Sequence, residues 1–374
     1  MSTWWQPGQL LVAGFDGTTL PGDLAQLLAQ GRVGGVILFA RNIEGPEQLR
    51  RLVTEIREAA PDDAPAFVSI DQEGGRVQRL RAPWTQWPPM RRLGELDELD
   101  KTAAVATSLA AELRDVGIHL DFAPVVDVDT NPDNPVIGDR SFGRDAARVG
   151  RHAARFIEAM QAEGVAACAK HFPGHGDTQT DSHLHLPRLP HALERLREVE
   201  LPPFARAIEA GVASIMSAHV VFEAIDRKRP ATLAPDVIAI LREELGFSGV
   251  VFSDDLEMKA IADHFRPEDV VDGALRAGVD ALLACREPAL REIVLRRLER
   301  TPDAVVEGAI GRMIALKQRF VCASAPAPEV PDAGTSKIAT DLVAAMAAMD
   351  TTPPAPEGPP YPAHQRLADE IARG

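Results

Sequence analysis

Cysteine is scarce in this sequence, and positive charge is outnumbered by negative charge. The three cysteines among 374 residues, Cys168, Cys285 and Cys322, form no CxxC pair. An odd number of widely spaced cysteines is typical of reduced thiols in a cytoplasmic protein and not of a disulfide framework. The formal net charge is −15, whereas nucleic acids and anionic membranes are bound by basic surfaces. We therefore expect no nucleic-acid partner and no membrane partner.

Long apolar runs and common cofactor motifs are absent as well. No stretch approaches the roughly 20 apolar residues of a transmembrane helix. The N-terminal segment MSTWWQPGQLLVAG lacks the basic region of a signal peptide. The sequence has no glycine-rich dinucleotide motif after its first expected strand, and no Walker A, GxSxG or HExxH motif. These absences favour a cytoplasmic protein that uses no cofactor.

Short apolar runs, rich in β-branched residues, alternate with longer helical patterns over the first 320 residues. The runs are continuously apolar, which is typical of strands buried on both faces of a parallel sheet. The expected strands are Gln9–Ala13, Gly35–Phe39, Ala66–Asp71, Ile118–Ala123, Val165–Lys170, Ala213–His219, Gly249–Asp254 and Val279–Cys285. The helical patterns between them include Thr102–Asp115, Ala146–Glu163, Leu193–Ala210, Ala234–Leu245, Glu268–Ala277 and Glu287–Arg300.

A glycine marks the end of most helical patterns, because glycine tolerates the left-handed conformation that terminates a helix. These glycines are Gly117, Gly164, Gly211, Gly246 and Gly278. Eight parallel strands with intervening helices predict an α/β fold, a single (β/α)₈ TIM barrel over residues 1–320. A doubly wound sheet is the alternative, but its glycine fingerprint is missing.

Residues 321–374 differ in composition and form an extra C-terminal tail. ASAPAPEVPDAG, rich in Pro and Ala, predicts a linker. TTPPAPEGPPYP predicts disorder. Helices are predicted at Thr335–Ala348 and Ala363–Ala372. We expect this partly helical or disordered tail to be dispensable for activity, and a tail that binds a partner or docks in a dimer is the alternative.

Polar residues gather where five of the expected strands end, which is where barrel enzymes place their catalytic groups. Side chains alternate along a strand, so only one of Asp254 and Asp255 is expected to point into the barrel. We favour a catalytic role for one of these acids over simple capping, and a substrate-clamping role for at least one arginine over surface ion pairs. The clustered residues are Asp71, Arg76, Arg79, Asp121, Asp127, Arg140, Lys170, His171, His219, Asp254 and Asp255.

The segment Lys170–His185 is unusually rich in histidine. It contains four histidines, two aspartates and two glycines. Asp181 lies two residues before His183, close enough for a carboxylate to orient an imidazole and stabilise its protonated form. An imidazole on a glycine-containing loop suits a proton transfer that needs closure over a substrate. We prefer this interpretation to a plain polar surface loop.

Two alternatives stay open at this point. A metal-dependent barrel hydrolase would use the same imidazoles and carboxylates as zinc ligands, although their spacing does not match HExxH. A non-enzymatic sugar-binding barrel would not need both the histidine segment and the paired acids of the seventh strand. Chelation tests the first alternative, and turnover of a chromogenic glycoside tests the second.

Four segments resemble the family 3 glycoside hydrolases, and in particular the bacterial β-N-acetylhexosaminidases of the NagZ type. The resemblance extends over about residues 10–320, and the third segment is the most specific, because the β-glucosidases of the family lack this histidine loop. The segments are DQEGGRVQR (Asp71–Arg79), IGDRSFG (Ile137–Gly143), KHFPGHGDTQTDSH (Lys170–His183) and FSDDLEM (Phe252–Met258).

The resemblance implies a retaining mechanism in two steps. The family nucleophile corresponds to Asp254, with Asp255 as the alternative because the two acids are adjacent. The general acid/base corresponds to His183, and Asp181 is its dyad partner. The substrate contacts correspond to Asp71, Arg79, Arg140, Lys170 and His171.

The resemblance also implies a substrate with terminal, non-reducing, β-linked N-acetylglucosamine (GlcNAc). Such enzymes remove the sugar from GlcNAc–anhydro-muropeptides during cell-wall recycling in the cytoplasm. We expect a monomer without a metal. Some relatives with this histidine dyad transfer the sugar to phosphate, so a glycoside phosphorylase is the alternative to a hydrolase.

Overall fold

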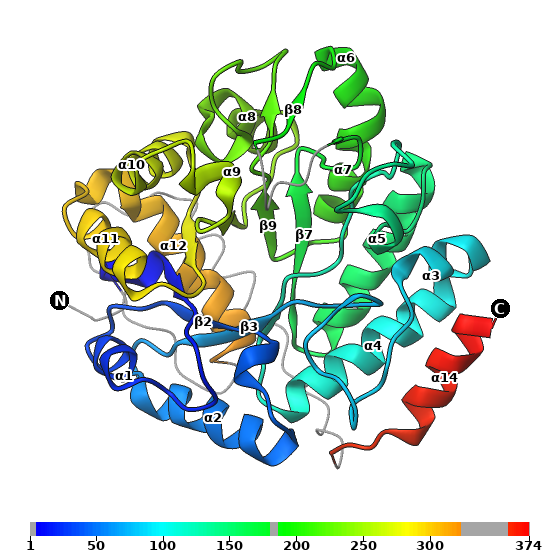
Figure 1. Cartoon of the computed structure of the whole chain (residues 1–374), viewed down its shortest axis with the longest axis horizontal. Coiled ribbons are helices and arrows are strands. Elements are labelled where there is room, and N and C mark those ends of the chain that lie inside the picture. The colour runs from blue at the N-terminus through cyan, green and yellow to red at the C-terminus, as the bar shows by residue number, and fades with distance from the viewer. Residues whose placement is uncertain (1–4, 180–185, 323–357, 374) are drawn as a thin grey trace.

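Eight parallel strands close into a barrel in the computed structural model, which describes residues 5–179, 186–322 and 358–373 (Figure 1). The strands follow one another around the barrel in chain order, and the last pairs with the first. All eight expected strands are confirmed, and the closed sheet excludes a doubly wound fold. They are β1 (Leu11–Ala13), β2 (Gly35–Leu38), β3 (Phe67–Ile70), β6 (Leu120–Asp121), β7 (Ala166–Phe172), β9 (Ser214–Ser217), β11 (Val250–Asp255) and β12 (Ala281–Ala284).

Helices surround the barrel, as Figure 1 shows. The five glycines expected to end helices all have positive φ, between 70° and 97°, so that prediction is confirmed. The helices of the barrel are α1 (Gly22–Ala29), α2 (Pro46–Ala59), α3 (Met90–Leu96), α4 (Leu99–Asp115), α5 (Ala146–Ala162), α6 (Leu193–Arg195), α7 (Leu201–Glu209), α8 (Pro235–Ala239), α9 (Lys259–Ala262), α10 (Pro267–Ala277), α11 (Pro288–Leu298) and α12 (Asp303–Phe320).

The predicted helix Leu193–Ala210 is less regular than expected. A wider π-helical turn, Leu196–Glu200, separates α6 from α7. Pro202 and Pro203 follow this turn. Neither has a backbone N–H to donate to the preceding turn. The loss of two donors accounts for the break in the α-helical ladder.

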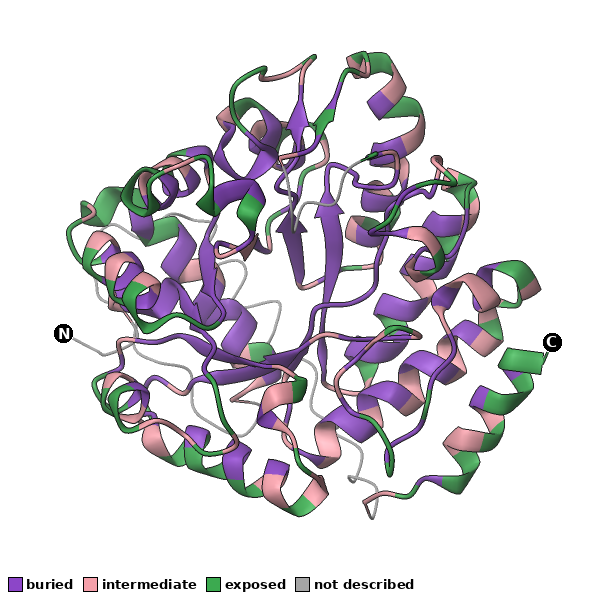
Figure 2. Ribbon diagram, viewed as in Figure 1, coloured by how far each residue is buried: buried purple, intermediate pink, exposed green. Residues whose placement is uncertain are grey.

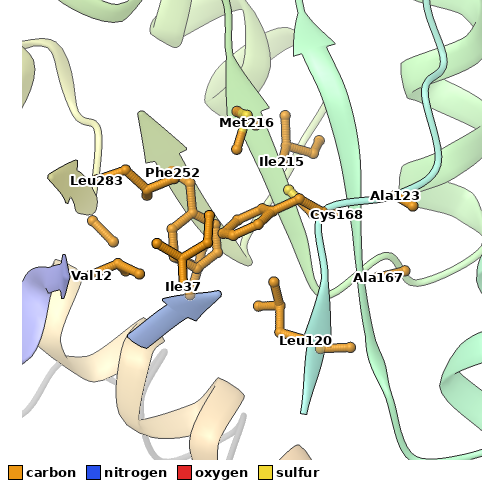
Figure 3. Packing of buried hydrophobic residues seen from close by; sticks show 14 of the residues in the cluster. Val12, Ile37, Leu120, Ala123, Ala167, Cys168, Ile215, Met216, Phe252 and Leu283 are labelled. Carbon is orange, nitrogen blue, oxygen red and sulfur yellow. The ribbon is translucent and has the colours of Figure 1, made fainter. Parts of the chain in front are cut away.

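Aromatic rings fill the barrel interior. The rings of Phe67 and Phe122 both pack edge-on against Phe252, with centroids 6.2 Å and 5.3 Å away. Gly35 makes room for this stack, because a Cβ there would lie 2.3 Å from the Phe67 ring. Figure 3 shows Phe252 among the aliphatic side chains of neighbouring strands, and Figure 2 shows buried strands inside helices that are buried on their inner faces. This packed interior makes the barrel a rigid base for the loops at its carboxyl end.

Two small sheets, which the sequence did not predict, lie in the loops that follow barrel strands. The strands β4 (Gln72–Gly74) and β5 (Val77–Gln78) form an antiparallel hairpin directly after β3. The strands β8 (Arg188–Leu189) and β10 (Val221–Phe222) pair in parallel and join the loops after β7 and β9. Both sheets restrain loops at the carboxyl end of the barrel.

The C-terminal helix α14 (Pro362–Arg373) packs against α3 and α4 on the outside of the barrel (Figure 1). Its Ala368 and Ile371 are buried, and the hydroxyl of Tyr361 donates to Asp115 Oδ2 at 2.7 Å. The helix expected at Ala363–Ala372 is therefore confirmed, and it docks on the barrel. The helix expected at Thr335–Ala348 lies outside the described residues.

Across residues 5–179, 186–322 and 358–373, none of the helices combines the length and the apolar character needed to cross a bilayer.

Candidate active site

A pocket opens at the carboxyl ends of the barrel strands and holds most of the residues singled out by the sequence. Its cavity measures about 150 Å³. The residues that line it come from β2, β7, β9, β11 and β12 and from the loops after β2, β3, β6, β7, β11 and β12. The charged and imidazole groups on its wall are Asp71, Glu73, Arg79, Arg140, Lys170, His171, His175, Asp254 and Asp255.

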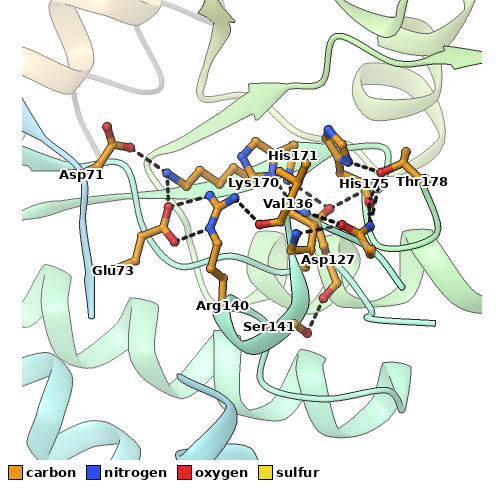
Figure 4. A network of polar contacts seen from close by, with 12 residues as sticks. Asp71, Glu73, Asp127, Val136, Arg140, Ser141, Lys170, His171, His175 and Thr178 are labelled. Atoms are coloured by element: carbon orange, nitrogen blue, oxygen red, sulfur yellow. Dashed lines mark hydrogen bonds and ion pairs between the residues drawn. The ribbon is translucent and has the colours of Figure 1, made fainter. Parts of the chain in front are cut away.

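One side of the pocket is a network of ion pairs (Figure 4). Lys170 Nζ lies 2.8 Å from Asp71 Oδ1 and 2.6 Å from Glu73 Oε1. Arg140 donates two hydrogen bonds to Glu73, from Nε to Oε2 and from Nη2 to Oε1, each 2.8 Å. Arg79 Nη2 lies 3.3 Å from Asp71 Oδ2. The network therefore joins the loops after β3 and β6 to strand β7.

The ion pairs keep these buried groups charged. Burial raises the pKa of Asp71, but Lys170 and Arg79 outweigh it and bring that pKa below its usual value. Burial likewise raises the pKa of Glu73, and the charges of Arg140 and Lys170 reverse the effect. The pKa of Lys170 is raised, because its two carboxylate partners outweigh the desolvation that lowers it. The pocket thus presents fixed donors and acceptors suited to sugar hydroxyls and amides.

Two histidines form the next part of the wall. His171 Nδ1 lies 2.7 Å from Asp127 Oδ2, and Asp127 also accepts the backbone N–H groups of His171 and His175. Asp127 is 1% exposed. Because an ionised carboxylate only accepts, the contact requires the proton of His171 to lie on Nδ1, which leaves Nε2 for the pocket. Burial, followed by the charge of His171, lowers the pKa of His175 to about 4, so this second ring is neutral at pH 7.

The two adjacent acids of β11 have opposite electrostatic surroundings. Burial raises the pKa of Asp254, but His219 and His171 outweigh it, and the result lies below the usual value. Burial raises the pKa of Asp255 to about 7. His219 Nε2 donates to the backbone carbonyl of Asp255 at 3.0 Å, and this bond fixes the end of β11. Asp254 is therefore the acid that is fully ionised at neutral pH.

Asp121 stabilises the turn between β3 and β4 through a hydrogen bond. Its Oδ1 accepts the backbone N–H of Gln72 at 2.8 Å, and Gln72 Oε1 accepts the N–H groups of Arg79 and Leu80. Burial raises the pKa of Asp121 to about 8. A neutral carboxyl at this turn can hold the loop without repelling the carboxylate of Asp71, which directly precedes Gln72.

The structure brings together all five predicted substrate contacts and the predicted nucleophile. Asp71, Arg79, Arg140, Lys170, His171 and Asp254 all line the pocket. Asp255 lines the pocket too, and its Oδ1 accepts the backbone N–H of Glu257 at 3.0 Å. The register of β11 is irregular between Phe252 and Asp255, so the side chains at this strand end need not alternate strictly.

Asp181 and His183 lie outside the described residues, but the chain on both sides of them is anchored. Asp177 contacts His191 through Oδ2 and Nε2 and accepts a hydrogen bond from Thr130 at 3.0 Å. Thr178 contacts His175 Nδ1 at 2.8 Å. Described residues on either side of this segment are therefore held by side-chain contacts, and Thr178 contacts a histidine that lines the pocket.

Glu73 and Asp127 are the site residues to which sequence reasoning gave too little weight. Glu73 is the shared partner of Lys170 and Arg140. Its position two residues after Asp71 was an available signal, since alternate residues of an extended segment face the same side. Asp127 had no such signal, because its partners are 44 or more residues away in the chain.

Arg76 has a different role from Arg79. Its guanidinium donates to the backbone carbonyls of Val136 and Ile137 at 2.6 Å and 3.0 Å and pairs with Asp139 at 3.3 Å. It thus holds the loop that carries Arg140 in place. The sequence did not indicate which of the arginines has this structural role and which lines the pocket.

Two of the four histidines on which the metal alternative rests, His183 and His185, lie outside the described residues. Across residues 5–179, 186–322 and 358–373, His, Cys, Asp and Glu side chains nowhere form a group of three or more suited to a metal ion. His171 and His175 instead use their Nδ1 atoms for Asp127 and Thr178.

Comparison with known proteins agrees with this architecture. Residues 7–319 match the family model described as the glycosyl hydrolase family 3 N-terminal domain. The chain belongs to glycoside hydrolase family 3. It is thus an enzyme of the glycoside hydrolase class, and the resemblance carried by its four motifs is confirmed.

Individual members of family 3 are similar over most of their length. The β-hexosaminidase of Alkalilimnicola ehrlichii is 41% identical over 310 residues, which cover 81% of this chain and 88% of that protein. The structure of a family 3 β-N-acetylglucosaminidase from Paenibacillus sp. is similar with a TM-score of 0.83 at 38% identity, over 92% of this chain and 68% of that one. NagZ from Neisseria gonorrhoeae gives a TM-score of 0.75 at 30% identity over 97% of both chains.

Proposed function

We propose that this glycoside hydrolase is a retaining β-N-acetylhexosaminidase that removes terminal, non-reducing, β-linked GlcNAc. The observation that carries the proposal is the pocket itself, in which an ionised Asp254 faces a wall of fixed hydrogen-bonding groups. The names of the similar proteins, β-hexosaminidase and β-N-acetylglucosaminidase, supply the sugar.

Asp254 is the proposed nucleophile. A carboxylate must be ionised to attack the anomeric carbon and form a glycosyl-enzyme intermediate. His219 and His171 favour the ionised form of Asp254, whereas burial favours the protonated form of Asp255. This difference supports Asp254 over its neighbour.

His183 is the proposed general acid/base, with Asp181 as the carboxylate that orients it. In the first step the imidazolium would protonate the departing oxygen, and in the second the neutral imidazole would take a proton from water. An unperturbed imidazole has a pKa of about 6.5, which suits both directions. This assignment comes from the KHFPGHGDTQTDSH motif, and the contact of Thr178 with His175 of the pocket is compatible with it.

The remaining pocket residues would bind the sugar. Asp71 can accept hydrogen bonds from hydroxyl groups, and Arg79, Arg140 and Lys170 can donate to hydroxyls or to the N-acetyl carbonyl. His171 would present Nε2, because Asp127 holds its other nitrogen. These groups are already paired with one another, so binding costs little reorganisation.

The biological substrate we propose is the GlcNAc–anhydro-muropeptide class of cell-wall fragments, processed by a monomer in the cytoplasm without metal or cofactor. The NagZ resemblance of the motifs and the similarity to NagZ from Neisseria gonorrhoeae support this placement. The acidic net charge of −15 also fits a small-molecule substrate better than a nucleic acid.

A panel of p-nitrophenyl glycosides tests sugar, acceptor and metal dependence together. We expect turnover of the β-GlcNAc glycoside, unchanged by EDTA, with the free sugar released first as its β anomer. Release of sugar 1-phosphate when phosphate is added would instead make the protein a phosphorylase. Activity that EDTA abolishes and Zn²⁺ restores would favour the metal-dependent alternative.

Substitution of the paired acids tests the nucleophile. Asp254→Ala should lower kcat by roughly 10⁴-fold or more, since the covalent step is lost, while the far-ultraviolet circular dichroism spectrum stays unchanged. The matched control is Asp255→Asn, which keeps the shape of a protonated carboxyl and should retain most turnover. If the Asp255 variant is inactive and the Asp254 variant active, the nucleophile is the second acid.

A further inference from the structure

The segment Thr85–Trp87, which follows the β4–β5 hairpin, lies between that hairpin and the C-terminal helix α14. The segment is buried at Thr85 and Trp87, which are 2% exposed each. Figure 1 shows α14 beside α3 and α4, next to the loops that connect β3 with α3. The helix lies beyond residue 319, where the match to the family 3 domain ends.

The hairpin side of this contact is tight. The N–H of Trp87 donates to Gln78 Oε1 at 2.9 Å, and its carbonyl accepts the N–H of Gly75 at 2.9 Å. A Cβ on Gly75 would lie 2.8 Å from Pro89. The turn of the hairpin at Gly75 and the end of β5 at Gln78 are thus both bonded to the backbone of Trp87, and a shift of Trp87 must move the hairpin with it.

The other side of the segment is fastened to α14. The N–H of Gln86 donates to Gln365 Oε1 at 3.0 Å. His364 Nδ1 lies 2.8 Å from Glu112 Oε1, and the buried Glu112 also accepts the hydroxyl and the N–H of Thr85. The ring of His364 lies 6.1 Å from that of Trp87.

The hairpin in turn carries pocket residues. Glu73 lies on β4 and contacts both Lys170 and Arg140. Arg79 directly follows β5, lines the pocket and pairs with Asp71. A continuous path of hydrogen bonds and packed side chains therefore connects a helix outside the barrel with the charged wall of the pocket.

We propose that α14 is a positioning element of the active site, which clamps Thr85–Trp87 against the β4–β5 hairpin and so holds Glu73 and Arg79 in the geometry that binds the sugar. His364 and Gln365 are its positioning residues. Neither touches the pocket, so both act through the segment. A displacement of the hairpin by a fraction of an ångström would lengthen charge-assisted hydrogen bonds that work only at short range.

The test rests on the proposed glycosidase activity and uses three consecutive residues of α14 in the full-length chain. His364→Ala removes the contacts to Glu112 and Trp87, and Gln365→Ala removes only the bond to Gln86. Arg366→Ala changes the exposed side of the same turn and is the matched control. Steady-state kinetics on the β-GlcNAc glycoside, thermal melting and tryptophan fluorescence are measured for each.

We expect His364→Ala and Gln365→Ala to raise KM by about three- to tenfold at an almost unchanged kcat, the range expected for loss of one hydrogen bond. Their tryptophan emission should shift to longer wavelength, because Trp84 and Trp87 report on the segment. Arg366→Ala should match the wild type in all three measurements. If His364→Ala impairs folding, the milder Gln365→Ala decides the question.

An unchanged KM in both variants, together with a lowered melting temperature, would overturn the proposal and make α14 a purely structural cover of the barrel. Failure of the proposed function is a separate outcome. In that case the wild type itself does not turn over the β-GlcNAc glycoside.

Discussion

The orientation of His171 illustrates how single residues define this pocket. Its ring is fixed by the buried Asp127. This carboxylate accepts the ring N–H and the backbone N–H of His171 and the backbone N–H of His175. Such a carboxylate keeps a proton on Nδ1 of the imidazole and leaves Nε2 to face the substrate. The position of this proton depends on the charge of the Asp127 carboxylate as well as on its shape.

Asp127→Asn should therefore lower kcat/KM by about 10- to 100-fold, the range for loss of a hydrogen bond to a charged group. Nitrogen NMR of the imidazole checks the cause, because the proton should move from Nδ1 to Nε2. The control is Asp129→Asn, which weakens the pair with Arg91 at 2.7 Å and should affect stability alone. An Asp127 variant with wild-type kinetics would show that the tautomer of His171 does not matter.

The proposed acid/base makes a prediction that depends on the leaving group. His183→Ala should lose far more activity on glycosides with poor leaving groups than on nitrophenyl glycosides, since an activated leaving group needs little protonation. The measurement is kcat/KM across a series of aryl glycosides of increasing phenol pKa, in which the variant should show the steeper dependence. Equal losses across the series would count against His183 as the acid.

At the scale of elements, the β4–β5 hairpin is the part of the site that the sequence could not supply. The sequence indicated a glycine pair after Asp71, and these glycines have φ of +92° and +57°. What it did not indicate is that the turn packs on Pro88 and Pro89. A hairpin of two short strands is not stable alone. It needs other residues to pack against, and the sequence does not show which residues these are.

Gly75→Ala should raise KM and lower stability, because the new Cβ meets Pro89 and the backbone is left-handed. The control is Gly164→Ala, where φ is +82° and no atom lies within 4 Å of the new Cβ. That change should cost about 1 kcal/mol of stability with normal kinetics. Identical kinetics in both variants would show that the hairpin tolerates displacement.

At the scale of the whole molecule, a buried lysine links stability to pH. Lys317 of α12 is fully buried and contacts Gln9 ahead of β1, at the amino end of the barrel. Burial lowers its pKa to about 7 from a usual value of 10.5. The unfolded chain therefore binds one more proton than the folded chain between these pH values, so this group makes stability rise with pH from about 7 to 10.5.

Lys317→Met keeps the side-chain length and removes the charge, so it should abolish that rise. Urea unfolding at pH 6 and pH 9 measures it: the free energy of unfolding of the wild type, relative to the variant, should be larger at pH 9. A difference that is the same at both pH values would mean that Lys317 stays protonated in the folded state.

Much of this enzyme was determined by its sequence alone. Continuous apolar runs separated by helical patterns and terminal glycines were sufficient for the eight strands, because each of these signals is local. The position of polar residues at strand ends then identified Asp71, Arg79, Arg140, Lys170, His171 and Asp254 as one group, since parallel strands bring their carboxyl ends to one face.

Tertiary structure decided the rest, because the deciding contacts join residues far apart in the chain. Only the folded chain pairs Glu73 with Lys170 and Arg140 and places Asp127 under His171. Only burial and neighbouring imidazoles separate the acidity of Asp254 from that of Asp255. The docking of α14 beside the β4–β5 hairpin likewise depends on the surface that the closed barrel creates, and no local pattern in the tail encodes that surface.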